Sequence, residues 1–347
     1  MPAIPRVPRL LLLGGAAALG MRALRQGRRI DFQDRVVLIT GGSRGLGLVL
    51  ARTFAQEGAR LAILARDAAE VRRAEDDLRA EGAEVRGFAC DVRDQHQIDE
   101  TIQRIIDHYG RLDVLVNDAG VIQVGPLDHM TVADFKEAMG IHFWGPLYTM
   151  LAARPHLRKS GQGRIVNIAS IGGKIAVPHL LPYSASKFAL VGLSDGMRAE
   201  LARDGIRVTT VCPGLMRTGS PPNAYFKGNN DAEYAWFTVS DSLPVTSVAA
   251  EHAARQIVDA CRYGDPELTI SIQAQLVARA NALFPGLTGE VMAVVNRLLP
   301  APQPGAGSAR KTGWQSQSPV APSPLTRLSD EATTANNELD GHAPLTP

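Results

Sequence analysis

The chain has 347 residues, 45% of them hydrophobic and 21% charged, which is the composition of an ordinary globular protein. Its net charge of +2 and the lack of a basic stripe interleaved with aromatic residues argue against a nucleic-acid partner. The cysteines Cys90, Cys212 and Cys261 have neither a zinc-site spacing nor the even number of a disulfide framework. We therefore expect buried thiols in a reducing compartment and no metal site.

Residues 1–30 contain six arginines and no acidic residue, and they enclose an uncharged run at 10–21, LLLLGGAAALGM. As a helix this run would reach about 18 Å, short of the roughly 30 Å of a bilayer core. It could be the core of a signal peptide, an anchor in the membrane interface, or a helix packed on the domain. We expect residues 1–31 to hold the chain on a membrane with the rest in the cytoplasm; without such an anchor the protein would be cytoplasmic.

Short apolar runs alternate with segments of helical periodicity between residues 32 and 300. Most runs are continuous rather than alternating in polarity, as expected for strands buried on both faces of a parallel sheet. The pattern predicts an α/β fold, a Rossmann-type doubly wound parallel sheet in a single domain. The expected strands are residues 35–40, 60–65, 84–89, 112–117, 163–170, 206–212 and 267–272.

Two local patterns indicate helices between these strands. Apolar side chains at 98, 102, 105, 106 and 109 share one helical face. Thr131 and Asp134 have the spacing of a capping box that begins another helix.

The last part of the chain differs in composition. Residues 283–300 form a second apolar stretch, which could dock near the membrane or simply close the fold. Residues 301–347 are rich in Pro, Ser, Ala, Thr and Gly, so they offer little apolar surface to bury, and we predict a disordered tail.

A glycine-rich loop, GGSRGLG at 41–47, follows the first expected strand and precedes a helix. Glycines let the backbone turn tightly and approach a ligand, and the helix start offers free N–H groups to an anion. In this context the loop predicts a site for the pyrophosphate of a dinucleotide. A turn that merely needs glycine is the alternative.

The second expected strand ends in Arg66, where an NAD site usually has an acidic residue that binds the ribose. Arg44 lies within the glycine loop. Two guanidinium groups suit a 2′-phosphate because each grips phosphate with paired donors. We therefore predict NADP(H) as the cofactor, with Asp67 as a ribose ligand in the alternative.

Tyr183 and Lys187 are four residues apart and share a helical face, and Ser170 ends the fifth expected strand. A tyrosine with its ordinary pKa of about 10 is a poor base at neutral pH. A neighbouring ammonium group and an oxidised nicotinamide both favour the phenolate and bring that pKa toward the working pH. Ser170 could hydrogen-bond a substrate oxygen as charge develops there.

Five features of the chain resemble, as a set, the signature of the classical short-chain dehydrogenase/reductase family: TGGSRGLG (40–47), NDAG (117–120), Ser170, YSASK (183–187) and PGLMRT (213–218). The resemblance covers about residues 34–275. It implies Tyr183 as general acid/base, Lys187 as its electrostatic partner, Ser170 as the residue that orients the carbonyl, and a homodimer or homotetramer. The cofactor-binding residues that it implies are Gly41, Ser43, Arg44, Gly45, Leu46, Gly47, Arg66, Asp91, Val92, Asn117, Ala119, Gly120, Tyr183, Lys187, Pro213, Gly214 and Thr218.

Two positions depart from the family's pattern. Asp118 replaces the second Asn of NNAG, and we expect it to accept the same bonds and stabilise the central sheet. His142 stands where the family has an Asn that bends its helix and holds a water of a proton relay. We include His142 among the catalytic residues because it could carry protons, although it could equally be a packed helix residue.

Residues 214–244 show no strong strand pattern, and in the family this segment covers the substrate. Its aromatic residues suggest an apolar pocket, or they pack the segment onto the domain. We predict an NADP(H)-dependent oxidoreductase that transfers a hydride between the nicotinamide and an apolar carbonyl or alcohol. A catalytically impaired nucleotide-binding sensor or interaction protein is the alternative, and only His142 favours it. The aromatic residues of segment 214–244 are Tyr225, Phe226, Tyr234, Trp236 and Phe237, and Phe143 and Trp144 could join them in the same pocket.

Overall fold

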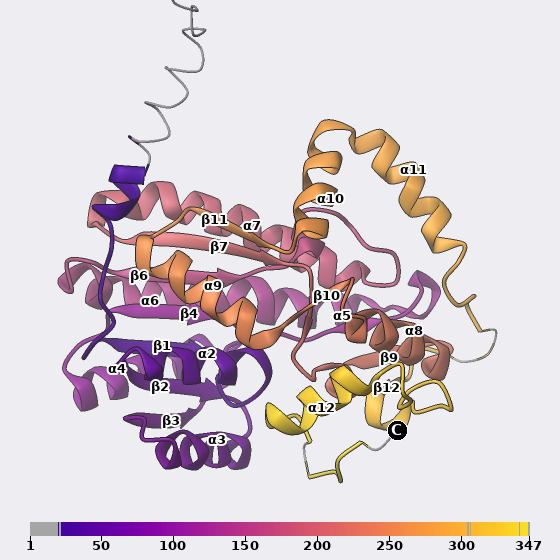
Figure 1. Cartoon of the computed structure of the whole chain (residues 1–347), viewed down its shortest axis with the longest axis horizontal. Coiled ribbons are helices and arrows are strands. Elements are labelled where there is room, and N and C mark those ends of the chain that lie inside the picture. The colour runs from indigo at the N-terminus through magenta and orange to yellow at the C-terminus, as the bar shows by residue number, and fades with distance from the viewer. Residues whose placement is uncertain (1–19, 21, 304, 306, 340, 346–347) are drawn as a thin grey trace, which may run out of the picture.

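A computed structural model describes residues 20, 22–303, 305, 307–339 and 341–345. The apolar run at 10–21 therefore lies, apart from Gly20, outside the described residues. The centre of the molecule is a seven-stranded sheet in the order β11-β7-β6-β4-β1-β2-β3, with every pair parallel (Figure 1). The strands are β1 (Val36–Thr40), β2 (Arg60–Ala65), β3 (Val85–Ala89), β4 (Val114–Asn117), β6 (Arg164–Ile168), β7 (Arg207–Pro213) and β11 (Glu267–Ile270).

These strands confirm the predicted doubly wound sheet, because each coincides with one of the seven apolar runs to within two residues at either end. The order reverses between β1 and β4: the chain runs outward from β1 to β3 and then returns to build the other half from β4 to β11. In such sheets ligands bind at the carboxyl ends of the strands beside this reversal.

Helices cover both faces of the sheet (Figure 1). Phe54 and Ile257 belong to the apolar core on one face, and Ile102 and Leu157 belong to the core on the other. The first face carries α2 (Gly45–Gln56), α3 (Ala68–Ala80) and α9 (Ala250–Tyr263), and the second carries α4 (Gln95–Tyr109), α6 (Gly145–Lys159) and α7 (Leu181–Leu201).

Both local helix predictions are confirmed. The apolar stripe at 98–109 lies on α4, where Ile98, Ile102 and Ile105 are buried. Helix α5 (Val132–Met139) begins with the predicted capping box, in which the Asp134 carboxylate accepts hydrogen bonds from the Thr131 backbone N–H and hydroxyl.

A smaller lobe lies beyond the carboxyl ends of the strands. It contains a two-stranded sheet of β8 (Leu215–Arg217) and β10 (Ser247–Ala249), and helix α8 (Asn230–Ser242). A second small sheet has the order β12-β9-β5, from Arg310–Thr312, Tyr225–Lys227 and Gln123–Val124. Strands β8 and β9 were not expected, because strands of three residues are too short to show a period in the sequence.

The predicted disorder of residues 301–347 is wrong for much of that segment. Strand β12 pairs antiparallel with β9, and helix α12 (Arg327–Ala335) packs against α8 (Figure 1). The segment is held by its small polar side chains: Thr333 Oγ1 donates to the Gly219 carbonyl at 3.2 Å and Asn336 Nδ2 to the Thr218 carbonyl at 3.0 Å. The prediction of disorder considered only how little apolar surface the segment could bury, and such hydrogen bonds are not visible in its composition.

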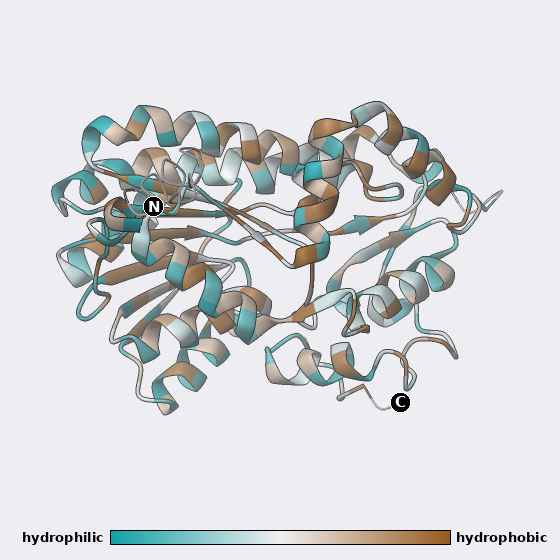
Figure 2. Ribbon diagram, turned by 45° about the horizontal axis from the view of Figure 1, so that its top comes forward, coloured by the Kyte–Doolittle hydropathy of each residue, from teal (hydrophilic) through white to brown (hydrophobic). Residues whose placement is uncertain are grey.

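Helices α10 (Ile272–Leu283) and α11 (Pro285–Asn296) form a hairpin that projects from the body (Figures 1 and 2). No residue of α11 is buried, and Phe284 and Leu287 are 60% and 66% exposed. The apolar stretch at 283–300 therefore does not close the fold. Among the helices that the structure describes, none is long and apolar enough to cross a membrane.

Candidate functional site

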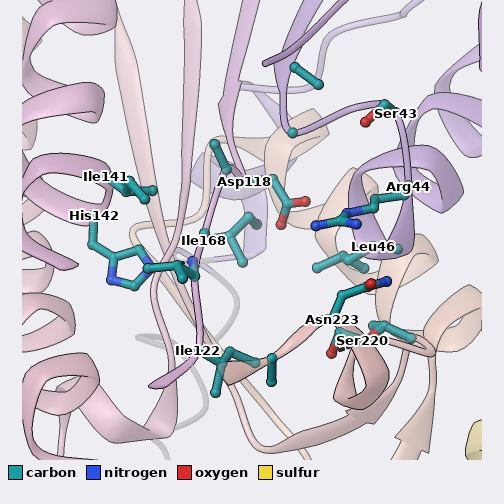
Figure 3. A pocket seen from close by; sticks show the side chains of 18 of the residues that line it. Ser43, Arg44, Leu46, Asp118, Ile122, Ile141, His142, Ile168, Ser220 and Asn223 are labelled. Carbon is teal, nitrogen blue, oxygen red and sulfur yellow. Dashed lines mark hydrogen bonds between the residues drawn. The ribbon is translucent and has the colours of Figure 1, made fainter. Parts of the chain in front are cut away.

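A cleft of about 620 Å³ opens at the carboxyl ends of β1 and β4, between the glycine loop and the smaller lobe (Figure 3). It lies at the point of strand-order reversal, where the fold predicts a ligand. Its lining comes from the main sheet, the smaller lobe and the C-terminal segment.

The glycine loop forms the floor of one end of this cleft. Gly41 and Gly45 have φ angles of +74° and +55°, which residues other than glycine rarely adopt. A Cβ atom on Gly47 would lie 2.2 Å from the Gly41 carbonyl oxygen, so only glycine lets α2 begin so close to the loop. This cradle of backbone at a helix start fits the diphosphate of a dinucleotide.

Most of the predicted site residues line the same cleft. The predicted residues that line it are Gly41, Ser43, Arg44, Gly45, Leu46, Arg66, Asp91, Val92, Ala119, Gly120, His142, Ser170, Tyr183, Lys187, Pro213, Gly214 and Thr218.

Gly47 and Asn117 are the two predicted residues outside this lining. Gly47 lies behind the loop, where its lack of a side chain lets helix α2 contact the Gly41 backbone. The Asn117 side chain is buried between strands, where its Nδ2 donates to Asn167 Oδ1 at 2.8 Å and its Oδ1 accepts from Thr149 Oγ1 at 2.7 Å. Bonds to strand β6 and helix α6 thus hold the Asn117 side chain, and its contact with the cofactor stays a prediction.

Ser170, Tyr183 and Lys187 meet in the cleft, as their positions at strand and helix ends predict. Lys187 Nζ lies 5.6 Å from the centre of the Tyr183 ring and donates to the Ile168 carbonyl at 2.8 Å. The Ser170 hydroxyl accepts from the Gly172 backbone N–H at 3.0 Å. These bonds fix the lysine and the serine beside the phenol.

Burial is the largest influence that the chain itself exerts on the pKa of Tyr183. Burial raises the pKa of Tyr183 to about 12, and a hydrogen bond with Ser170 opposes that rise only in part. Desolvation of the phenolate therefore outweighs any help from Lys187 within the chain itself. Within the chain itself, a pKa of about 12 keeps the phenol protonated at neutral pH.

Asp118, which replaces the second Asn of the family's NNAG pattern, faces the cleft. The prediction that it stabilises the central sheet is corrected accordingly. Its carboxylate points into the cleft on the side of Arg44 (Figure 3). Burial raises the pKa of Asp118 and lowers the pKa of Lys187, and the attraction between their charges opposes both changes. An Asn at this position would not supply that charge to the lysine.

His142 lies in a π-helical turn, η2 (Gly140–Trp144), with its ring edge-on to Tyr183. Its Nε2 accepts from the Val121 backbone N–H at 3.1 Å, so the proton resides on Nδ1. Nδ1 then donates to Ser186 Oγ at 2.7 Å, and that hydroxyl donates to the Tyr183 carbonyl. With both ring nitrogens engaged, we propose that His142 positions the Tyr183 helix rather than relaying protons.

The pH dependence of stability tests this proposal. Burial lowers the pKa of His142 well below its usual value. As the pH falls through about 6.5, His142 therefore binds a proton in the unfolded chain but stays neutral in the folded chain. Stability is then complete above pH 6.5 and falls as the pH decreases. Between pH 7.5 and 5.5, we expect wild type to lose more unfolding free energy than His142→Asn, by up to about 1.4 kcal/mol, measured by urea denaturation. Equal losses would mean that His142 is charged in the folded protein.

The end of the cleft beside strand β2 holds the two predicted arginines. Arg66 is exposed at the end of β2, and Arg44 Nη1 lies 3.5 Å from Glu70 Oε1. The Asp67 carboxylate caps helix α3 by accepting from the backbone N–H groups of Ala69 and Glu70, which lower its pKa. This role disfavours Asp67 as a ribose ligand.

The other end of the cleft is less aromatic than predicted. Tyr225 lines it, but Phe226, Tyr234 and Phe237 are buried in a core cluster of the smaller lobe. Trp144 stacks on Tyr148. Aliphatic residues that line the same cleft include Val121, Ile122, Ile141 and Ile168, and Ile141 lies beside His142 (Figure 3).

Sequence reasoning missed the residues that the smaller lobe and the tail bring to the cleft. They are Met216, Ser220, Asn223, Ala224, Thr312 and Glu338. Nothing in the composition of the tail marks Glu338 as a site residue, since its partners lie in other parts of the fold.

The cysteines are buried and free, as predicted. Within the described residues, no three His, Cys, Asp or Glu side chains gather in a way that could hold a metal ion.

A doubly wound sheet, a glycine cradle and a Ser–Tyr–Lys set in one cleft define a dinucleotide-dependent oxidoreductase. The pattern of the short chain dehydrogenase family matches residues 35–224. The chain belongs to this family, whose members use NAD or NADP.

Individual relatives agree with this assignment. The uncharacterized oxidoreductase YxnA of Bacillus subtilis (strain 168) is 31% identical over 75% of this chain and 72% of its own length. D-threitol dehydrogenase of Mycolicibacterium smegmatis is 32% identical over 58% of this chain and 80% of its own. The crystal structure of a short-chain dehydrogenase from Streptomyces avermitilis has 30% identity and a TM-score of 0.63, covering 76% of this chain and 99% of that one.

Proposed function

We propose that the protein is an NADP(H)-dependent oxidoreductase that interconverts an apolar ketone or aldehyde and its alcohol. The dinucleotide supplies or accepts the hydride. In reduction, the Tyr183 hydroxyl donates its proton to the carbonyl oxygen, and the Ser170 hydroxyl donates a hydrogen bond to the same oxygen. Lys187 and Ser170 favour the phenolate left on Tyr183.

The meeting of Ser170, Tyr183 and Lys187 beside the glycine cradle carries this proposal. The raised pKa of Tyr183 suits the acid role, since the phenol holds its proton until a substrate oxygen takes it. Oxidation of NADPH in the presence of a panel of apolar ketones tests the activity.

The aliphatic lining supports an apolar substrate. Ile122, Ile141 and Ile168 offer no hydrogen bonds from their side chains, so a polyol would leave its hydroxyl groups without partners there. A substrate with one polar group, placed at Ser170 and Tyr183, suits such walls.

The preference for NADP(H) rests on Arg44 and Arg66 at the adenosine end. We expect Arg66→Asp to weaken NADPH binding by one to two decades, because a lost charge-assisted bond costs roughly 1.5–3 kcal/mol. Binding of NADH should change little. Both affinities can be measured by fluorescence titration, with Arg72→Asp on the exposed side of α3 as the matched control. Equal affinity of wild type for NADH and NADPH would contradict the preference.

We also propose that the protein associates with a membrane surface from its cytoplasmic side. The arginines and apolar run within residues 1–31 support this, and the exposed apolar side chains of α10 and α11 offer a second contact. Sedimentation with phosphatidylserine-containing vesicles should carry down the full chain more completely than a variant that begins at Asp31. A full chain that stays in the supernatant at low salt would contradict the proposal.

A further inference from the structure

Residues 327–339, here called the C-terminal strap, run from the smaller lobe to the glycine loop (Figure 1). Helix α12 anchors the strap on the lobe. A Cβ atom on Gly219 would lie 2.4 Å from the Thr333 backbone nitrogen, so the two backbones are in close contact. Ser329 Oγ donates to Asp241 Oδ2 at 3.3 Å, and Asn336 Nδ2 donates to the Thr218 carbonyl.

The strap then bonds directly to the loop that fits a diphosphate. The Gly45 backbone N–H, at the first residue of α2, donates to the Asn336 carbonyl at 2.9 Å. The Asn337 side chain donates to the Ser43 carbonyl at 2.8 Å. One N–H at the start of the helix is thus already engaged by the protein's own chain.

The Glu338 carboxylate lies in the cleft beside this loop. The residue is 3% exposed, and its Oε2 accepts from Asn223 Nδ2 at 2.6 Å and lies 3.5 Å from Arg44 Nε. A Cβ atom on Gly45 would lie 2.6 Å from Glu338 Oε1. A buried negative charge therefore touches the backbone that would receive the diphosphate, and it also favours the neutral form of Asp118.

Two anions cannot share this corner of the cleft without repulsion in a poorly solvated site. We propose that the strap gates the cofactor cleft: Glu338 competes with the diphosphate at the glycine loop, and dinucleotide binding displaces residues 336–338. The inference rests on the proposed use of a nicotinamide dinucleotide. Displacement of the strap adds a free-energy cost to dinucleotide binding. Weakening the strap therefore raises the apparent affinity for the dinucleotide.

Hydrogen exchange of the full-length protein measures the displacement directly. We expect backbone exchange in residues 327–339 to become faster when saturating NADP⁺ is added, while exchange in the central strands is unchanged or slower. Slower exchange in the strap would show that it closes over the cofactor, which overturns the proposal. Unchanged exchange would overturn it too.

Variants of the strap test the competition. We expect Glu338→Gln, which keeps the size of the side chain, to lower the Kd for NADP⁺ by about tenfold, within the usual 5–150-fold range of such coupling. Asn337→Ala should act in the same direction without changing the charge. Glu331→Gln, on the exposed side of α12, is the matched control and should leave the Kd unchanged.

A Glu338→Gln variant that binds NADP⁺ no better than wild type, or more weakly, would contradict the competition. Its folding can be checked by thermal denaturation. If neither protein binds NADP⁺ or NAD⁺, the proposed function fails, and the gate fails with it. Binding accompanied by a slower-exchanging strap overturns the gate alone.

Discussion

Replacement of Tyr183 by phenylalanine is expected to lower turnover by about 10²–10⁴-fold, the usual contribution of a positioned proton donor. The phenol acts on the substrate oxygen in the transition state, and the ring that packs beside His142 is retained. The Kd for NADPH should therefore change little. Rates of NADPH oxidation and fluorescence titrations on the same preparations measure the two quantities.

Tyr148→Phe is the matched control, because Tyr148 stacks on Trp144 and does not line the cleft. Its turnover should remain close to that of wild type. Substantial turnover by Tyr183→Phe would exclude Tyr183 as the proton donor, whatever the cofactor.

Replacement of Gly47 by alanine should abolish dinucleotide binding and destabilise the fold. The added Cβ would lie 2.2 Å from the Gly41 carbonyl oxygen, which real Cβ contacts do not reach, so the loop and α2 must move apart. Overpacking of this kind costs about 1–3 kcal/mol, and the moved loop loses its diphosphate geometry. Urea denaturation and cofactor titration measure the two effects.

Gly192→Ala provides the control, since Gly192 is also inside a helix but has nothing within 4 Å of an added Cβ. There the change should stabilise the protein by up to about 1 kcal/mol, the ordinary helical preference for alanine. A Gly47→Ala protein that binds NADPH normally would show that the loop tolerates a side chain, against the structure.

The sheet and much of the cleft could be predicted because their signals are local. Strands buried on both faces, such as β1 and β6, appear as continuous apolar runs, and ligand sites on doubly wound sheets follow at the strand ends. The order of runs and motifs along the chain is therefore enough to predict that the glycine loop, Ser170 and Tyr183 line one cleft, as they do.

The remaining parts depend on contacts between distant segments. Asn117 has the expected sequence context, yet Asn167 and Thr149 hold its side chain within the protein. The aromatic residues near 234 have a composition that suits either a pocket or a core, and tertiary packing makes them a core. The strap is held by single hydrogen bonds to loops more than 100 residues away, which leave no periodic signal.

Transfer of deuterium tests the central claim most directly. NADPH labelled with deuterium at the transferable C4 position is incubated with the protein and a panel of apolar ketones, and the alcohols are analysed by mass spectrometry. We predict one deuterium in the alcohol formed by wild type, and about 10²–10⁴-fold less labelled alcohol from Tyr183→Phe in the same time. Tight NADPH binding with no labelled alcohol from wild type would contradict an oxidoreductase acting on apolar carbonyl groups and would favour the nucleotide-binding sensor.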